Sequence, residues 1–416
     1  MQEKAKEPEI RFAGFTGAWE QRKLSDIAER ITRKNTHLES TLPLTISSSY
    51  GLIDQYAYFN NRVASRNTRN YYLIKNGEFA YNKSYSDGFP FGSVKRLDRY
   101  AMGVLSTLYI IFSIDYRKVN SDFLVSYYDT KNWHHQVALR AAEGARNHGL
   151  LNISADDFFE TELKIPMNLD EQKKIGSFFD QLNSFITLHQ RKYEKLLNIK
   201  KSMLEKMFPK EGEVVPEIRF KGFTGAWEQR KLGDVLEFLK DGTHGTHPDA
   251  DQGPLLLSAK NIKNGDVTWD DTDRKISQAE FDMIHSNFKL KKGDVLLTIV
   301  GSIGESAILK DPHEITFQRS VAFLRPNKTI TSGFLYSEIQ GEKFQTELNN
   351  RKSTSAQPGI YLGDLSEIPL DTPPNLKEQE EIGKFFSEIN SLLTLHQRKL
   401  EMLKNVKQAF LEKMFV

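Results

Sequence analysis

Two long segments of the chain place apolar residues at alternating steps of three and four, with polar residues between them. In 168–208 the series begins with Ile175, Phe179, Leu182, Ile186 and His189, and in 375–415 it begins with Ile382, Phe386, Ile389, Leu393 and His396. This is the a/d spacing of a left-handed coiled coil. It predicts two helices, each roughly 60 Å long, whose apolar seams pack against each other.

Polar residues interrupt the predicted seam at matched places. His189 and His396 are one pair, and Lys200 and Lys407 are another. Polar a/d residues fix register and orientation at some cost in stability, and this structural role is the prediction. A catalytic or metal-binding role for the histidines is the alternative.

The whole chain is one unit of about 207 residues written twice. Residues 8–24 and 216–232 differ only at Ala13 and Lys221, and 25 of 41 positions are identical between 168–208 and 375–415. We call these four segments the frame. Two copies of a domain-sized unit predict pseudo-two-fold symmetry, with antiparallel helices and neighbouring chain ends, rather than a solenoid of short repeats.

The residues between the frame segments diverge, and we call 25–167 module 1 and 233–374 module 2. Strand-like apolar runs such as Leu105–Phe112 and Val295–Val300 alternate with glycine-bearing turns and two helical candidates, 123–139 and 334–348. The modules are therefore predicted to be mixed α/β. The common frame indicates that both halves share one function. The dissimilar modules indicate that each half performs its own version of a second, related function.

Composition narrows the chemistry. The chain has no cysteine, which excludes disulfides, thiolate metal sites and cysteine nucleophiles, and its net charge is +2. No apolar run reaches the ~18–20 residues of a membrane span, and the first residues have no secretory apolar core, so a cytoplasmic protein without membrane contact is expected. No phosphate-binding loop, nucleophile elbow or H-E-x-x-H motif occurs.

One histidine pair requires an alternative interpretation. His244 and His247 lie close to Asp249 and Asp251 in a glycine-rich stretch. A metal pair is one interpretation, but no third ligand is fixed by the spacing, and a surface loop with local hydrogen bonds is the prediction.

Module 1 has features of a nucleic-acid-binding surface. Residues 56–147 contain 13 Lys and Arg against 7 Asp and Glu, interleaved with tyrosines and phenylalanines. Arg, Lys, Asn, Ser and Tyr in loops are the side chains that contact phosphates and base edges.

Several motifs carry a family resemblance over essentially the whole chain. These are FTGAWEQRKLSDI and FTGAWEQRKLGDV at the frame starts, the EQ-x-x-IG-x-FF…LHQRK-x-E helices, and KDGTHGTHPDADQGPLLLSAKNI, GDVLLTIVGSIG and SAQPGIYLGDLSEIPL in module 2. The sequence resembles the specificity subunits of type I restriction–modification systems. Module 1 departs from the pattern, because it has EGARNHGLLNIS where module 2 has SAQPGIYL.

The resemblance implies an α+β fold of two pseudo-symmetric α/β target-recognition domains separated by two long antiparallel coiled-coil helices. The implied division is 1–167 and 210–374 for the recognition domains, and 168–209 and 375–416 for the spacer helices. It implies a non-catalytic subunit that binds double-stranded DNA, one half-site per domain, and docks two methyltransferase (M) subunits and restriction (R) subunits. S-adenosylmethionine, ATP and Mg²⁺ would belong to those partners, with adenine-N6 methylation and ATP-dependent cleavage performed by the complex.

The residues expected to contact DNA lie in polar loops of both modules. In module 1 they are Lys83, Tyr85, Ser86, Lys95, Arg140, Arg146 and Asn147; in module 2 they are Thr243, His244, Lys260, Asn261, Ser302, Arg319, Ser355 and Gln357. Two alternatives stay open: a coiled-coil scaffold with no DNA role, and a duplicated DNA-modifying enzyme, which should carry its active-site acids in register in both copies.

Overall fold

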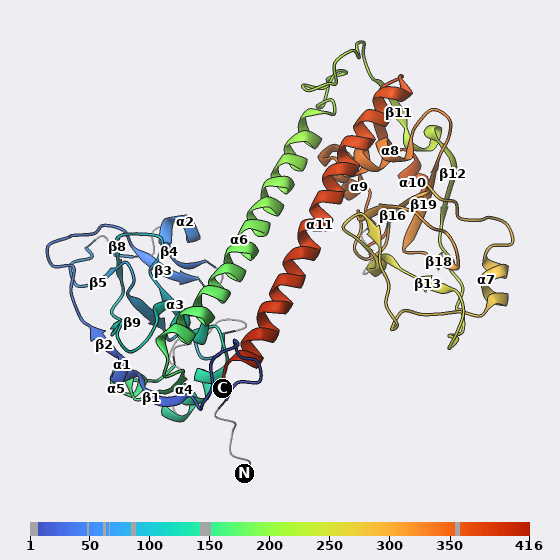
Figure 1. Ribbon diagram of the computed structural model, residues 1–416. Coiled ribbons are helices and arrows are strands. Elements are labelled where there is room, and N and C mark those ends of the chain that lie inside the picture. The colour runs from blue at the N-terminus through green and yellow to red at the C-terminus, as the bar shows by residue number, and fades with distance from the viewer. Residues whose placement is uncertain are drawn as a thin grey trace. The chain divides into compact units, whose positions relative to one another are not determined.

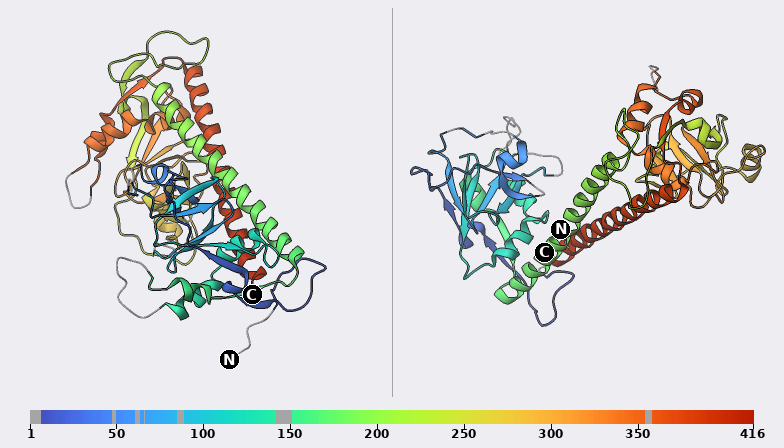
Figure 2. Two further views of the ribbon diagram at one scale, coloured as in Figure 1. Left: turned by 90° about the vertical axis from the view of Figure 1, so that its left-hand side faces the viewer. Right: turned by 90° about the horizontal axis from the view of Figure 1, so that it is seen from above.

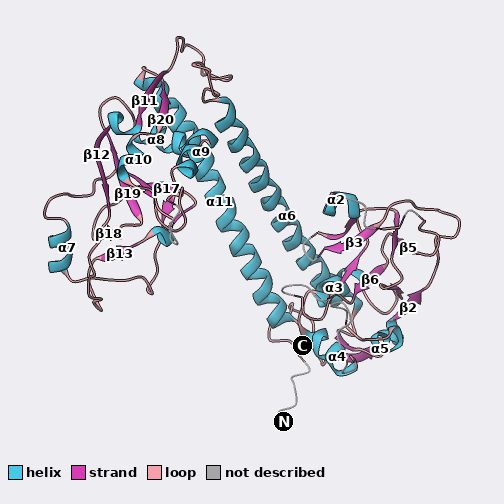
Figure 3. Ribbon diagram, turned by 180° about the vertical axis from the view of Figure 1, so that it is seen from behind, coloured by secondary structure: helices cyan, strands magenta, loops and turns pink. Residues whose placement is uncertain are grey.

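The computed structural model describes residues 7–47, 50–60, 64–65, 67–84, 89–141, 151–353 and 358–416. The chain divides into two compact units. Unit 1 runs to Leu188 and adds Leu400–Val416, and unit 2 is His189–Lys399. Each unit therefore holds one module and one end of each long helix, α6 (Leu169–Lys206) and α11 (Leu376–Met414). Figure 1 labels the elements, and Figure 3 shows that both units mix helices and strands.

Unit 1 is built around a four-stranded antiparallel sheet in the order β2-β9-β6-β7, with three further strand pairs, β1-β10, β3-β4 and β5-β8. Its elements before α6 are β1 (Glu20–Lys23), α1 (Leu24–Ile27), β2 (Ala28–Ile31), β3 (Leu44–Ser47), β4 (Gly51–Asp54), α2 (Gln55–Phe59), β5 (Tyr72–Lys75), β6 (Phe79–Asn82), β7 (Ser93–Arg96), β8 (Met102–Leu105), β9 (Ile110–Ile114), α3 (Ser121–Tyr128), α4 (Asn132–Arg140), α5 (Ala155–Phe159) and β10 (Glu162–Ile165).

Unit 2 repeats the central sheet as β12-β19-β16-β17 and the outer pair as β11-β20. Its other pairs differ from those of unit 1: they are β13-β18, which is parallel, and β14-β15. Its elements before α11 are β11 (Glu228–Lys231), η2 (Leu232–Val235), β12 (Leu236–Asp241), β13 (Leu255–Leu257), η3 (Ala259–Asn261), β14 (Ile262–Lys263), β15 (Asp266–Val267), α7 (Gln278–Ile284), β16 (Val295–Thr298), β17 (Ser306–Ile308), β18 (Ile315–Phe317), β19 (Val321–Pro326), α8 (Ser332–Ile339), α9 (Glu342–Asn350), α10 (Leu362–Ser366) and β20 (Pro369–Thr372).

Each central sheet is apolar on both faces. In β16, Val295 and Leu297 belong to the core that includes α8, whereas Leu296 belongs to a second core with β13 and β18. Successive strand residues point to opposite faces, so a sheet buried on both sides requires an unbroken apolar run. This explains why the residues of Val295–Val300 are almost all apolar, instead of alternating between apolar and polar.

The long helices are antiparallel, as the contacts inside each unit show. In unit 1, Phe415 just after α11 packs on Phe179 near the start of α6, with ring centroids 5.7 Å apart. In unit 2, Phe208 just after α6 packs on Phe386 near the start of α11, at 6.1 Å. Figure 2 shows α6 and α11 as continuous helices in two further views. The predicted α+β class, with two pseudo-symmetric mixed units and two long antiparallel helices, is confirmed.

In each unit the end of one long helix packs on the start of the other, and we call this contact the junction. The repeated segment 8–24 packs on the junction of unit 1, and 216–232 packs on that of unit 2. Trp19 packs edge-on against Phe415, with centroids 6.0 Å apart, and Trp227 packs edge-on against Phe208 at 5.8 Å. Each frame start therefore holds the end of the helix that the other copy encodes.

A buried ion pair ties the same segment to the start of its own copy's helix. Arg11 donates two hydrogen bonds to Glu171, at 2.6 and 2.8 Å, and Arg219 makes the same pair of bonds to Glu378 at the same distances. Both carboxylates are only 1% exposed. A bidentate guanidinium supplies the geometry that a buried carboxylate needs.

The glutamine after each of these glutamates caps a helix of the module. The Gln172 Oε1 atom accepts the N–H of Asn120, the residue before α3, at 2.7 Å. The Gln379 Oε1 atom accepts the N–H of Thr331, the residue before α8, at 2.9 Å. These backbone donors at helix starts have no partner within the helix, so the repeated Glu-Gln pair joins frame and module.

The repeated glycines let helices approach closely. A Cβ at Gly176 would lie 2.6 Å from the backbone nitrogen of Phe123 in α3, and one at Gly383 would lie 2.8 Å from the carbonyl carbon of Gly333 in α8. Only glycine permits this crossing, which fixes the angle at which each module sits on the helix pair in its own unit.

The start of each repeated segment is hydrogen-bonded to the end of the long helix from the other copy, as the duplication predicts. The Ile10 N–H donates to the Lys413 carbonyl at 2.9 Å, and the Ile218 N–H donates to the Lys206 carbonyl at 2.8 Å. No helix in the described part of the chain has the length and apolar character to cross a bilayer.

Candidate nucleic-acid interface

Three loops of module 2 meet at one end of its central sheet, around the short link between β18 and β19. In this link the Arg319 N–H donates to the Thr243 carbonyl at 3.0 Å. Ser320 accepts the Ala259 N–H at its Oγ (3.0 Å) and the Ile299 N–H at its carbonyl (2.9 Å). The loop after β12, the loop after β13 and the loop after β16 therefore form one polar edge.

The β16 loop continues this edge. Val300 forms an antiparallel bridge with Gly359, and the Ile360 N–H donates to the Ile299 carbonyl at 3.0 Å. The Thr298 hydroxyl donates to the Ser302 carbonyl and accepts the Glu305 N–H at 2.9 Å. The loop is held by these bonds, which leaves Ser302 exposed at its tip.

The predicted cations on this edge differ in how far they are already paired. His244 is 64% exposed and lies 2.6 Å from the Asp241 carboxylate. Lys260 is equally exposed and lies 2.7 Å from Asp273, and its hydrogen bond lowers the pKa of Asp273 to about 2. Arg319 is exposed, and among the described residues its guanidinium has no hydrogen-bond or ion-pair partner. All the guanidinium donors of Arg319 are therefore available to a ligand at this edge.

Two of the predicted residues have structural contacts. The Asn261 side chain is buried: its Oδ1 accepts the Ser258 N–H at 2.9 Å and its Nδ2 donates to the Thr268 carbonyl at 3.0 Å. The Thr243 hydroxyl lies 2.6 Å from the His247 Nε2 atom. Asn261 thus shapes the loop, and its amide is occupied inside the protein.

His247 is a buried member of a hydrogen-bond chain. Its Nδ1 atom lies 2.6 Å from the Glu280 carboxylate, and its Nε2 atom faces Thr243. Arg274 donates to the His247 carbonyl at 2.6 Å and pairs with Asp249. These contacts occupy both ring nitrogens and explain why the glycine-rich loop needs this histidine for its conformation.

The three predicted basic residues of module 1 that the structure describes are engaged in contacts within the protein. Lys83 donates to the Ile153 carbonyl at 3.2 Å, and burial together with the charge of Arg30 lowers its pKa. Lys95 pairs with Asp129 at 2.8 Å, and Arg140 donates to the Gln136 side chain at 2.6 Å. The remaining predicted residues lie outside the described residues: Tyr85, Ser86, Arg146, Asn147, Ser355 and Gln357.

Module 1 presents a different edge at the equivalent place. By strand order, its β8–β9 link corresponds to the β18–β19 link, and this link consists of Ser106–Tyr109, without a cation. Leu108 in this link and Tyr50 in the β3–β4 turn are exposed. The sequence analysis missed both. Pairing the modules by strand order, rather than by sequence similarity, is the signal that finds them.

The predicted seam residues are buried or half-buried along both helices, and most residues between them are exposed. In unit 2 the seam brings the two Nδ1 atoms of His189 and His396 to 2.8 Å. Burial, together with Lys192 and Lys399, lowers the pKa of both imidazoles. One neutral ring can donate to the other at this distance, so the pair is a hydrogen bond between symmetry-equivalent residues.

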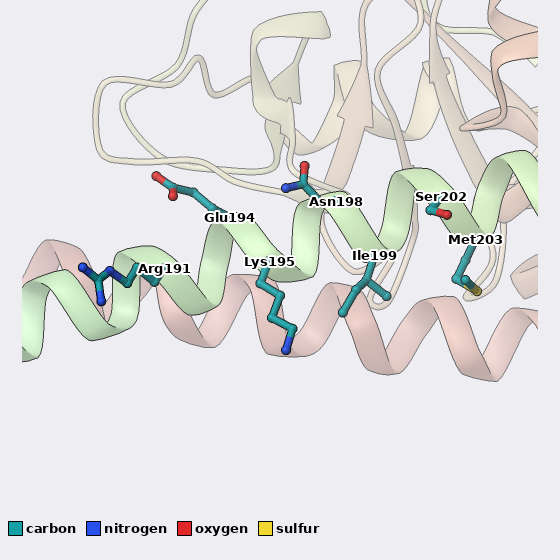
Figure 4. Close-up of a pocket in the computed structure, with 7 residues that line it drawn as sticks. All are labelled: Arg191, Glu194, Lys195, Asn198, Ile199, Ser202 and Met203. Atoms are coloured by element: carbon teal, nitrogen blue, oxygen red, sulfur yellow. The ribbon is translucent and has the colours of Figure 1, made fainter. Parts of the chain in front are cut away.

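The outer face of α6 carries a shallow hollow of about 500 Å³ in unit 2. Its lining side chains project from one face of the helix (Figure 4): Arg191, Glu194, Lys195, Asn198, Ile199, Ser202 and Met203. Charged residues and an exposed isoleucine are combined in this hollow.

Comparisons with known proteins agree with this geometry. The family described as "Type I restriction modification DNA specificity domain" matches residues 225–405. The MjaVIII specificity subunit of Methanocaldococcus jannaschii is 26% identical over 259 residues, which cover 59% of this chain and 60% of that protein. The EcoBI specificity subunit of Escherichia coli is 28% identical over 199 residues, covering 45% and 41%.

The aligned regions thus span less than two thirds of these relatives' length. A type I restriction–modification S subunit from M. genitalium has the same fold, with a TM-score of 0.61, 16% identity and 99% of both chains covered. The resemblance predicted from the repeated motifs is confirmed.

Proposed function

We propose, from the premise that this chain resembles type I specificity subunits in sequence and in fold, that it is the DNA-binding specificity subunit of such a complex. The observation that carries the proposal is a duplicated frame with the same junction in both units, holding two modules of unlike sequence. Each module would read one short half-site. Because the modules differ, the half-sites would differ too, and unread base pairs would separate them.

The polar edge of module 2 supports DNA reading by that module. Arg319 offers a guanidinium with no partner in the part of the chain that the structure describes, and this group forms the commonest specific contact with guanine in the major groove. Lys260 and His244 are exposed but paired with carboxylates, so each would have to exchange its partner for a phosphate. The chain itself would carry no catalytic residue.

The long helices would bind the methyltransferase subunits. Phe185 and Leu188 of α6 are exposed, and so are Leu392 and Leu395 at the equivalent positions of α11. Exposed apolar side chains at matched places on both helices favour two copies of one partner. S-adenosylmethionine would enter with these subunits, and ATP and Mg²⁺ would enter with restriction subunits.

Methylome sequencing of a host expressing the complete system tests the proposal. The expected result is a bipartite motif with two unlike halves, and Arg319→Ala should relax one half and cost about 1–3 kcal/mol of binding. Arg230→Ala, an exposed frame arginine paired with Glu228, is the matched control and should leave the motif unchanged. A continuous or palindromic motif would contradict the proposal.

A binding assay separates the alternatives. A scaffold with no DNA role should not shift duplex DNA even with methyltransferase subunits present. A duplicated enzyme should modify or cut DNA by itself. The specificity subunit should bind the bipartite target and direct methylation only when its partner is added.

A further inference from the structure

Unit 2 contains a polar cavity of about 380 Å³ between α6, α11 and module 2. The residues that matter for its chemistry are Lys200, Glu305, Tyr336, Gln340, Asn390 and Thr394. The cavity is lined by residues of both helices and by Ile303–Glu305, which follow Ser302 in the β16 loop. Its size is near the lower end for small-molecule sites.

Lys200 and Asn390 leave hydrogen-bond donors without partners among the described residues at this cavity. Lys200 donates to the Gln340 Oε1 atom, but an ammonium carries three donors. Among the described residues no carboxylate forms an ion pair with it, and burial lowers its pKa while the more distant Glu305 opposes this effect. The Asn390 Nδ2 atom is buried with no hydrogen-bond partner. An unpaired buried donor is costly, so a missing acceptor is indicated.

The equivalent lysine in unit 1 shows what that acceptor is. Lys407 occupies in the second copy of the repeat the position that Lys200 occupies in the first. Its Nζ lies 2.7 Å from the Asp129 carboxylate. Asp129 directly follows α3, as Gln340 directly follows α8. The pKa of Asp129 is lowered to about 2 by Lys95 and Lys407, against the effect of its burial. The carboxylate of unit 1 is thus replaced by a neutral amide in unit 2.

The second cation is replaced as well. Lys95 pairs with Ala80 across β6 and β7, and the matching register in β16 and β17 joins Leu296 with Ala307. Alanine is shorter than lysine, and this removes a side chain that in unit 1 helps to fill the space beside the carboxylate. The two substitutions together leave Lys200 facing a cavity where Lys407 faces a closed ion pair.

We propose that this cavity binds a small molecule with a single carboxylate, whose oxygens occupy beside Lys200 the place that Asp129 holds beside Lys407. The remaining donors of the Lys200 ammonium would bind both carboxylate oxygens. A singly charged carboxylate is favoured over a phosphate dianion because Glu305 lines the same cavity and repels additional negative charge. The neighbouring amides and the Tyr336 hydroxyl would contact the rest of the ligand.

Acetate is the simplest probe. The full chain is unfolded in urea at pH 7.5 with increasing sodium acetate, and sodium chloride keeps the ionic strength constant. A ligand that binds only the folded state raises stability in a saturable way. Wild type should show this saturable rise with acetate, and a smaller one with phosphate.

Two substitutions and a mirror variant make the test specific. Gln340→Asp restores the carboxylate of unit 1, and Lys200→Met removes the cation; each should weaken the apparent acetate affinity by at least about tenfold. The double variant Asp129→Gln/Lys95→Ala, which makes both replacements in unit 1, should add a second acetate-dependent rise in stability. The proposal is overturned if wild type shows no saturable acetate effect, if Gln340→Asp retains the wild-type response, or if phosphate binds more tightly than acetate.

Discussion

The junctions of the two units use the same residues, whereas the lysine sites a few turns along the helices do not. Arg11 and Arg219 bind Glu171 and Glu378 with the same two distances. A segment that touches its own helix start, the other copy's helix end and its own module can change in few ways, because three surfaces would have to change with it.

The lysine sites are less constrained. Lys407 meets a buried carboxylate, and Lys200 meets an amide and a cavity. Each donates a hydrogen bond to the residue that follows one helix of its module, so a substitution at that residue alters the chemistry and leaves the frame intact. The same holds two residues earlier, where Tyr127 in unit 1 corresponds to Glu338 in unit 2. The units are therefore equal in architecture and unequal in buried charge.

The largest expected effect tests the equality of the junctions. Arg11→Met and Arg219→Met each leave a buried carboxylate without its partner, which should cost about 3–5 kcal/mol and nearly the same amount in both variants. Urea unfolding measures this free energy. Lys23→Ala, which breaks an exposed pair with Glu160, is the control and should change little. Clearly unequal losses of unfolding free energy in the two variants would contradict the equivalence of the two junctions.

Glu338 should give unit 2 a pH dependence that unit 1 lacks. Burial and the neighbouring Asp371 raise the pKa of Glu338 to about 8. The fold therefore favours the protonated acid: this stabilisation is complete below the ordinary pKa of 4.5 and is lost as pH rises through about 8. The loss is at most about 5 kcal/mol.

Glu338→Gln imitates the protonated acid and should remove that dependence, so the variant should exceed wild type in stability at pH 9. Chemical unfolding at pH 5, 7 and 9 measures the difference. The matched control is Tyr127→Phe at the equivalent position, which should show no change in slope over this range. Parallel pH profiles for wild type and Glu338→Gln would contradict the assignment.

A smaller effect is expected at the histidine pair. Because the pKa of each imidazole is below its usual value, the neutral pair stabilises the fold above pH 6.5, and this contribution is lost as pH falls through the lowered pKa values. The double variant His189→Leu/His396→Leu should move the acid midpoint of unfolding, followed by circular dichroism, to lower pH. Exposed His313→Leu is the control, and an unchanged midpoint in the double variant would count against the prediction.

The smallest effect should come from moving the chain ends. Glu9 pairs with Lys413 at 2.6 Å, and Glu217 pairs with Lys206 at 2.9 Å, so Glu9 stands beside the end of α11 as Glu217 stands beside the end of α6. A permutant that joins Val416 to Met1 and opens the chain within 210–215 should lose no core contact. Its unfolding free energy should fall within about 1 kcal/mol of wild type. An insoluble permutant would contradict the symmetry.

The sequence by itself determined the duplication, the two long helices, their seam and their antiparallel pairing, because periodicity and repetition are properties of the chain alone. It also determined the mixed character of the modules and the family resemblance. It pointed to the loops around Thr243, Lys260, Ser302 and Arg319, but it did not distinguish exposed side chains from buried ones. Asn261 and Arg319 look equally suited to DNA in the sequence.

Only the tertiary structure decided which of these side chains are available. It buried Asn261 in a loop, paired Lys95 with Asp129 and left Arg319 unpaired among the described residues. It also revealed the difference between Lys200 and Lys407, which occupy the same seam position in both copies. The physical reason is that a charge's role depends on its partners and solvent exposure, and residues distant in the sequence, such as Gln340 and Asp129, supply both.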